Sequence, residues 1–163
     1  ISAAPVVAVC VDLEASSALT TALRDTVGRI LQAMPGARLA CLNILRLNRI
    51  GLNYALDSEG HNIHVNRLVE LKDWARPLDR HDAQTTFHVL EAADVAGALA
   101  DYARANRVDQ IVIGARGSSS VRRFLGSVSS RVVAEAPCTV TVVRAPQEAQ
   151  GEGAEELAVT EQP

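Results

Sequence analysis

Lysine is almost absent from this chain of 163 residues, because fifteen of its sixteen basic residues are arginine and Lys72 is the single lysine. A lysine Schiff-base enzyme or a lysine-dependent phosphate loop therefore has almost no candidate residue. The cysteines are few, widely spaced and odd in number: Cys10, Cys41 and Cys138. With no Cys-x-x-Cys pair, they predict neither a disulfide framework nor a zinc site. We expect small buried thiols in a reducing compartment, the cytoplasm.

Long apolar runs are also missing. No stretch approaches the roughly 18 residues of a membrane span, and no basic leader precedes the first apolar run. We therefore expect neither a membrane segment nor a signal peptide, although a domain cut from a longer protein is compatible with a chain that begins at Ile1.

The charges are unevenly distributed along the chain. The formal net charge is −3, but residues 147–163 hold five acids and no base, which leaves 16 − 14 = +2 for residues 1–146. A nearly neutral body argues against a broad nucleic-acid-binding face. We expect one domain over residues 1–146, followed by a disordered acidic tail over residues 147–163.

Apolar runs alternate with helical stripes along the first 146 residues. Strands are predicted at residues 5–11, 37–45, 85–90, 110–113 and 138–143. Helices are predicted over residues 19–34 (capped by Ser16 or Ser17), 64–78, 95–103 (capped by Asp94) and 121–132. Residues 46–65 are expected to form a long loop. This alternation predicts an α/β fold, a single doubly wound domain with a parallel sheet and helices on both faces.

Polar and glycine residues follow two of the predicted strands. Asp12 follows the first, and Gly114 and Gly117 follow the fourth, with Gly126 nine residues after Gly117 and Ser127 directly after Gly126. Ligands bind open α/β sheets at the carboxyl ends of the strands, and glycines let backbone N–H groups approach phosphates. The spacing is neither that of a P-loop nor that of a dinucleotide fingerprint. The alternatives to ligand binding are that the glycines only form turns and that Asp12 only caps the next helix.

Several blocks resemble the universal stress protein family. They are residues 111–117 (IVIGARG), 124–128 (FLGSV) and 136–144 (APCTVTVVR), with residues 9–12 (VCVD), 42–44 (LNI) and 88–91 (HVLE) matching the earlier strands. The glycine signature of that family is Gly-x2-Gly-x9-Gly-Ser/Thr. Here eight residues, not nine, separate Gly117 from Gly126, so the phosphate loop is one residue shorter than the family pattern.

The resemblance implies a five-stranded sheet of order 3-2-1-4-5 and a stress-response or regulatory module that binds ATP, with or without Mg²⁺, as a switch or dimeric adaptor. The implied nucleotide-binding residues are Val11, Asp12, Ile44, Ile113, Gly114, Gly117, Gly126 and Ser127. The resemblance further implies a homodimer that pairs through the last strand, residues 139–143.

Two other functions stay open. A dimeric interaction module without a nucleotide would account for the shortened loop, and a regulatory domain of a larger protein would account for the abrupt start. No catalytic residue is assigned, and slow ATP hydrolysis is the most that is expected. His61 and His64 lie near Asp57 and Glu59, but their spacing is no strong metal template, and we interpret them as exposed polar residues. No Gly-x-Ser-x-Gly elbow is present for Ser-His-Asp catalysis.

Overall fold

The computed structural model describes residues 4–46, 63–78, 84–115 and 126–146. Its strands are β1 (Val6–Cys10), β2 (Arg38–Arg46), β3 (Thr85–Ala92), β4 (Gln110–Gly114) and β5 (Thr139–Val143). Its helices are α1 (Ser17–Ala33), α2 (Ile63–Ala75), α3 (Val95–Ala105) and α4 (Ser127–Glu135), with a short 3₁₀ helix η2 (Arg76–Leu78) after α2. Each of the five predicted strands is present within two residues of its expected limits.

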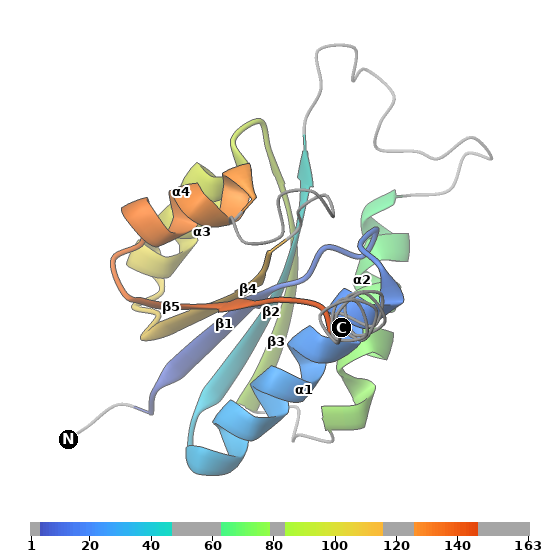
Figure 1. Ribbon diagram of the computed structural model, residues 1–163, viewed down its shortest axis with the longest axis vertical. Helices are drawn as coiled ribbons and strands as arrows, with labels where there is room; N and C mark the ends of the chain where they lie inside the picture. Colours follow the sequence, from blue (N-terminus) through green and yellow to red (C-terminus); the bar gives the residue numbers. More distant parts are fainter. Residues whose placement is uncertain (1–3, 47–62, 79–83, 116–125, 147–163) are drawn as a thin grey trace, which may run out of the picture.

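The five strands form one parallel sheet in the order β3-β2-β1-β4-β5 (Figure 1). This confirms the doubly wound α/β prediction and the 3-2-1-4-5 order. β1 lies at the centre, paired with β2 through Val9 and Cys41 and with β4 through Val9 and Val112. The strand order reverses between β1 and β4, so their carboxyl ends diverge there and leave space for a ligand.

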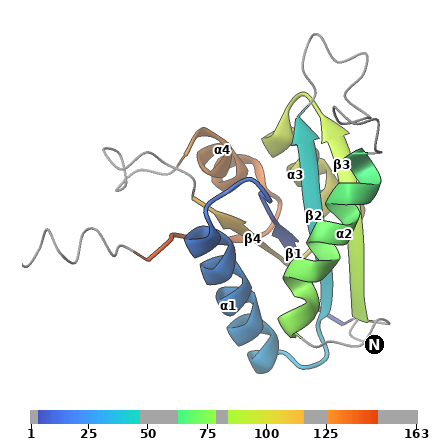
Figure 2. The same ribbon diagram turned by 90° about the vertical axis from the view of Figure 1, so that its right-hand side faces the viewer.

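Two helical layers cover the sheet. Figures 1 and 2 show α1 and α2 on one face and α3 and α4 on the other. Successive side chains of β1 point to opposite layers: Val7 and Val9 pack with the α1/α2 side, and Ala8 and Cys10 with the α3/α4 side. Because both faces are buried, the central strand is apolar throughout, which explains its continuous hydrophobic run.

The helix caps follow the sequence closely. Ser16 Oγ accepts the backbone N–H of Leu19 at 3.2 Å, so Ser16 is the N-cap of α1. Asp94 Oδ1 accepts the N–H of Gly97 at 3.2 Å and caps α3 as predicted. The predicted α4 stripe also included Val121, Phe124 and Leu125, which lie outside the described residues, as do the acidic tail and most of the 46–65 loop.

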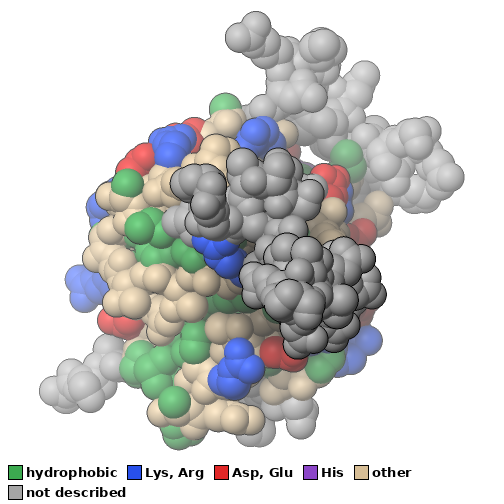
Figure 3. Space-filling model, in the orientation of Figure 1, with side chains coloured by type: hydrophobic (Ala, Val, Ile, Leu, Met, Phe, Trp, Pro, Cys, Tyr) green, Lys and Arg blue, Asp and Glu red, His purple; other side chains and the backbone are tan. Residues whose placement is uncertain are grey.

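Two further features bear on function. None of the helices in the described ranges combines the length and apolar character that crossing a membrane requires. On the face of the molecule in Figure 3, the coloured acidic and basic side chains are interspersed.

Candidate functional site

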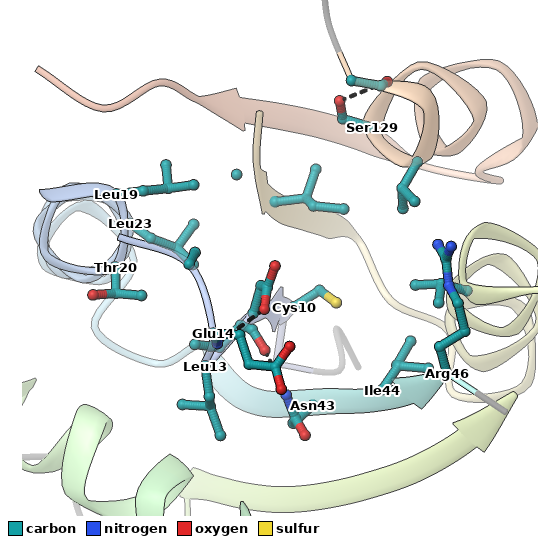
Figure 4. Close-up of a pocket in the computed structure, with 18 of the residues that line it drawn as sticks. Cys10, Leu13, Glu14, Leu19, Thr20, Leu23, Asn43, Ile44, Arg46 and Ser129 are labelled. Carbon is teal, nitrogen blue, oxygen red and sulfur yellow. Dashed lines mark hydrogen bonds between the residues drawn. The ribbon is translucent and has the colours of Figure 1, made fainter. Parts of the chain in front are cut away.

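A cavity of about 550 Å³ lies at the carboxyl end of the sheet, at the switch point between β1 and β4. Its walls come from four places: the end of β1 with the loop into α1, the end of β2, the end of β4, and the first turn of α4 (Figure 4). α1 contributes Leu19, Thr20 and Leu23, and α2 and α3 contribute one residue each. A cavity of this size is in the range of small-molecule and cofactor sites.

The structure brings together every predicted site residue that it describes. The residues that line this one cavity are Val11, Asp12, Ile44, Ile113, Gly114, Gly126 and Ser127. Gly117, the eighth, lies outside the described residues, and so do Arg116, Arg122 and Arg123. The convergence follows from the topology, since parallel strands end at the same edge of the sheet.

Asp12 forms a turn rather than a helix cap. Its Oδ1 accepts the N–H of Glu14 at 3.0 Å, and its carbonyl accepts the N–H of Ala15, also at 3.0 Å. Since Ser16 caps α1, Asp12 does not serve as its N-cap, which answers the alternative drawn from the sequence. The Asp12 carboxylate is held beside the cavity as a hydrogen-bond acceptor.

The apolar wall is formed mainly by the central strands. Val11 and Ile113 are buried, and Ile44 is half-buried on the α3/α4 side. Cys10 lies beneath them, and burial, assisted by the charge of Asp12, raises the pKa of its thiol to about 12. The thiol is therefore protonated at neutral pH, and Cys10 is part of the wall rather than a nucleophile.

Gly114 serves the packing of α1 against β4 as well as the approach of a phosphate that the sequence suggested. A Cβ built at this position would come within 3.1–3.2 Å of the Leu19 side chain. Glycine therefore lets α1 approach the end of β4 closely. This contact is a structural reason for the residue beyond the phosphate approach that the sequence suggested.

The first turn of α4 supplies backbone donors to the cavity. Gly126 is the N-cap of this helix and makes no side-chain capping bond. Its carbonyl accepts the Ser129 hydroxyl at 3.1 Å and the Ser130 N–H at 2.9 Å. The N–H groups of the first turn, at Ser127 and Val128, have no carbonyl partner within an α-helix. Both residues line the cavity, where such groups and the helix dipole suit an anion.

Sequence reasoning missed two buried polar residues among those described at the site, Asn43 and Ser129. Asn43 is 5% exposed, and its amide donates to the Val11 carbonyl at 2.9 Å, while its Oδ1 is buried without a partner. This bond ties the end of β2 to the end of β1. An asparagine inside an otherwise apolar strand was the available signal.

Sequence reasoning also missed the two arginines of the cavity. Arg67, from α2, donates to Glu14 Oε1 at 2.8 Å and to Glu70 Oε2 at 3.2 Å. Arg46, the last residue of β2, lines the cavity from the other side of the sheet. Neither has a sequence signal, because a lone arginine at a strand end or on a helix looks like an exposed residue.

The described histidines, His64 and His88, belong to no group that could hold a metal ion. Within the described ranges, no group of three or more His, Cys, Asp or Glu side chains is arranged to hold a metal ion. His64 Nε2 lies 2.7 Å from Glu91 Oε1, linking the start of α2 to the end of β3, and is about one-third exposed. His61, Asp57 and Glu59 lie outside the described residues.

The fold and the site define a doubly wound α/β domain whose ligand site lies at the switch point of the sheet. The Universal stress protein family model matches residues 5–144. The chain therefore belongs to the universal stress protein family, as the sequence blocks indicated.

Known proteins agree with this assignment. A relative from Thermus aquaticus, described as the universal stress protein in the QAH/OAS sulfhydrylase 3′ region, is 50% identical over 50 residues. That match spans 30% of this chain and 36% of the relative, about a third of its length.

Two solved structures show the same fold. A universal stress protein crystallised in complex with cAMP has a TM-score of 0.63 and 23% identity, with 89% of this chain and all of that one covered. A universal stress protein family protein from Arabidopsis thaliana with AMP bound has a TM-score of 0.60 and 16% identity, covering 89% of this chain and 94% of that one.

Proposed function

We propose that this stress-response domain binds an adenine nucleotide, ATP in particular, in the cavity at the switch point, and that the bound state acts as a switch. The observation that carries the proposal is the convergence on one cavity of the carboxylate of Asp12, the apolar ends of β1, β2 and β4, and the amino end of α4. The two solved relatives that hold cAMP and AMP support the same ligand class.

The lining residues match the parts of a nucleotide. Asp12 is an acceptor suited to ribose hydroxyls. Val11 and Ile44 offer an apolar surface for the adenine, and Ile113 and Gly114 lie beside the ribose. Gly126 and Ser127 begin α4, where backbone donors suit phosphate oxygens, and Gly117 is proposed to join them.

Magnesium fits as an ion that the nucleotide brings with it. The carboxylates that line the cavity are Asp12 and Glu14, and Glu14 is bound to Arg67. Mg²⁺ keeps several waters and commonly uses one or two carboxylates together with substrate phosphates. The described residues therefore suit Mg²⁺ delivered with ATP, with Asp12 and Glu14 as the carboxylates that line the cavity.

The test is to identify the nucleotide that purified protein carries and then to titrate it. Freshly purified, folded protein is denatured, and the supernatant is analysed by chromatography and mass. Nucleotide-free protein is then titrated calorimetrically with ATP, with and without Mg²⁺, and with GTP as the comparison. Saturable binding of ATP is the expected result. No binding of adenine nucleotides up to millimolar concentration would overturn the proposal.

We infer separately that two copies pair through β5, as in the dimeric module that the sequence left open. β5 is an edge strand, and it is short, β-branched and uncharged. Val140 and Val142 are only half-buried, and Val133 on neighbouring α4 is 48% exposed. An unprotected edge of this composition favours pairing with another strand.

Sedimentation velocity tests this pairing. A dimer is expected for the wild-type chain, and Val140→Lys is expected to shift it toward monomer because a charged edge resists strand pairing. Val69→Lys, at a site 53% exposed on α2, is the matched control. A wild-type chain that stays monomeric at micromolar concentration contradicts the inference.

The proposed compartment is the cytoplasm, because Cys10, Cys41 and Cys138 are free thiols and a reducing environment preserves them. Cell fractionation probed for this chain checks it, and recovery from an oxidising compartment would contradict it.

A further inference from the structure

Among the described residues, the charged side chains that line the cavity are balanced two against two. Asp12 and Glu14 are negative, and Arg46 and Arg67 are positive. Arg67 is already engaged, since Glu14 and Glu70 both accept from its guanidinium. Arg46 has no hydrogen-bond or ion-pair partner among the described residues. Of the two cations that line the cavity in the described part of the chain, Arg46 is thus the one available to a ligand.

The pleat of β2 sets the direction of Arg46. Ala40 and Leu42 pack into the α3/α4 layer, and Ile44 packs against the same cluster. Arg46 is the next residue in this alternation, so its side chain leaves the strand on that face. Figure 4 shows its guanidinium directed away from β2, toward the side of the cavity where α4 and Ser129 lie.

This position opposes the amino end of α4. Gly126, Ser127 and Val128 bound the cavity from α4, and Arg46 bounds it from β2. The two elements are far apart in the sequence and supply different donors, backbone N–H groups from one and a guanidinium from the other. Such a pair suits a group with several anionic oxygens, because arginine presents a planar fork to phosphate and an α-helix start presents N–H groups.

The net charge of the lining residues also favours an anion-binding role for Arg46. Without Arg46, the charges of the described residues that line the cavity would sum to −1, from two carboxylates and Arg67. A polyanionic nucleotide would then meet a lining of its own sign in a partly desolvated site, where charge interactions are stronger than in water. Arg46 brings that sum to zero.

We propose that Arg46 is a phosphate-binding residue of this site, donating to the nucleotide from the side opposite the amino end of α4. This inference rests on the proposed nucleotide-binding function. No lysine lines the cavity within the described part of the chain, and residues 118–125 are one residue fewer than the family signature has between its glycines. A cation supplied by β2 compensates for both.

The experiment compares ligands with and without phosphates on matched variants. Calorimetric titrations with ATP and with adenosine are run on the wild-type chain, Arg46→Gln, Arg46→Lys and Arg38→Gln. Arg38 is the matched control, because it is an exposed arginine at the opposite end of the same strand. Circular dichroism and thermal unfolding establish that each variant is folded.

Arg46→Gln is expected to weaken ATP binding by about 10- to 100-fold, the range for a hydrogen bond to a charged group. Adenosine binding should change by less than about twofold, Arg46→Lys should fall between wild type and Arg46→Gln, and Arg38→Gln should match wild type. The dependence of ATP affinity on salt should also weaken in Arg46→Gln.

The outcomes separate the two claims. Wild-type protein that binds no adenine nucleotide overturns the proposed function and this inference together. ATP affinity that is equal in wild type and Arg46→Gln overturns the inference alone. An equal loss for ATP and adenosine also overturns it, since Arg46 would then contact the nucleoside.

Discussion

The two ends of the parallel sheet use polar groups in opposite ways. At the amino end, Asp109 Oδ2 accepts the N–H of Val6 at 2.8 Å, and Asp109 N–H donates to the Val6 carbonyl at 2.9 Å. Arg38 N–H donates to the Pro5 carbonyl at 2.7 Å in the same region. At the carboxyl end, Asp12, Arg46 and the start of α4 face a cavity.

The difference shows how a doubly wound fold separates stability from binding. At the amino end, the hydrogen bonds of Asp109 with Val6 and of Arg38 with Pro5 lie within the chain and tie the strands together. At the carboxyl end the strands diverge around the switch point, where Arg46 and the first backbone N–H groups of α4 border a cavity that a ligand can enter. Substitutions at the two ends are therefore expected to change different measurements.

The largest effect is expected from Asp12→Asn at the carboxyl end. Removing the charged acceptor should weaken ATP binding by about 10- to 100-fold, because a hydrogen bond to a charged group contributes roughly 1.5–3 kcal/mol. Calorimetric titration measures it. Asp25→Asn, the same change at an exposed position of α1, should leave the affinity unchanged. Equal affinity for wild type and Asp12→Asn would remove Asp12 from the site.

Gly114→Ala tests the packing of Leu19 against Gly114, a residue that also lines the cavity. The new Cβ would press on Leu19, at 3.1–3.2 Å, and the free energy of unfolding should fall by about 1–2 kcal/mol. Urea unfolding measures the loss. Adding Leu19→Ala, which removes Cγ, Cδ1 and Cδ2, the atoms in contact, should cost less in Gly114→Ala than in the wild-type chain. If the two costs simply add, the Leu19 contact does not explain Gly114.

Asp109→Ala tests the amino end. Losing the bond to the Val6 N–H should lower the free energy of unfolding by about 0.5–1.5 kcal/mol and leave the ATP affinity of the folded protein unchanged. Asp101→Ala, which breaks only an exposed ion pair with Arg104, is the control and should cost about 0–0.5 kcal/mol. A drop in ATP affinity in Asp109→Ala would mean that the two ends are coupled.

The smallest effect is expected at Asp94, a carboxylate near the cavity whose hydrogen-bond partners lie within the chain. Hydrogen bonds from Arg131, and then from the Gly97 N–H, hold its pKa below the ordinary value of 3.8. Because the pKa of Asp94 is lower in the folded state, its ion pair and hydrogen bonds stabilise the folded protein. This stabilisation is fully present above the unfolded-state pKa and is lost as the pH falls through the folded-state pKa.

Arg131→Gln should move the Asp94 titration, followed by NMR, back toward its ordinary pKa. The difference in stability between wild type and this variant should then shrink below about pH 4. Identical Asp94 titrations in wild type and Arg131→Gln would contradict this account. Asp94 thus has its partners within the chain, whereas Arg46 has none among the described residues and is proposed to bind the ligand.

Local chemistry explains why most of the fold could be predicted. The run from Val6 to Val11 is apolar and β-branched, which suits a strand buried on both faces, and Ser16 and Asp94 are good N-caps. Element ends were less accurate. α2 ends at Ala75 rather than Leu78, because Pro77 lies in the 3₁₀ turn that follows.

The residues of the candidate site also differ in whether the sequence alone could predict them. Asp12, Gly114, Gly126 and Ser127 could be found because each lies at the end of a strand or at the start of a helix, where the local sequence pattern marks its position. Arg46 and Arg67 could not, because their importance depends on what they face, and Asn43 was marked only as a polar residue in an apolar strand. Arg67 matters through Glu14, 53 positions away in the sequence.

The sequence by itself determined the alternation of strands and helices, the apolar character of the central strands and the family, because these depend on side-chain periodicity and short motifs. Only the tertiary structure decided that Asp12 turns toward Glu14, that Gly114 makes room for Leu19, and that Arg46 stands across the cavity from α4. The reason is physical: a strand or a cap is chosen by neighbours along the chain, whereas a binding site is made by groups that only the packed sheet brings within reach of one ligand.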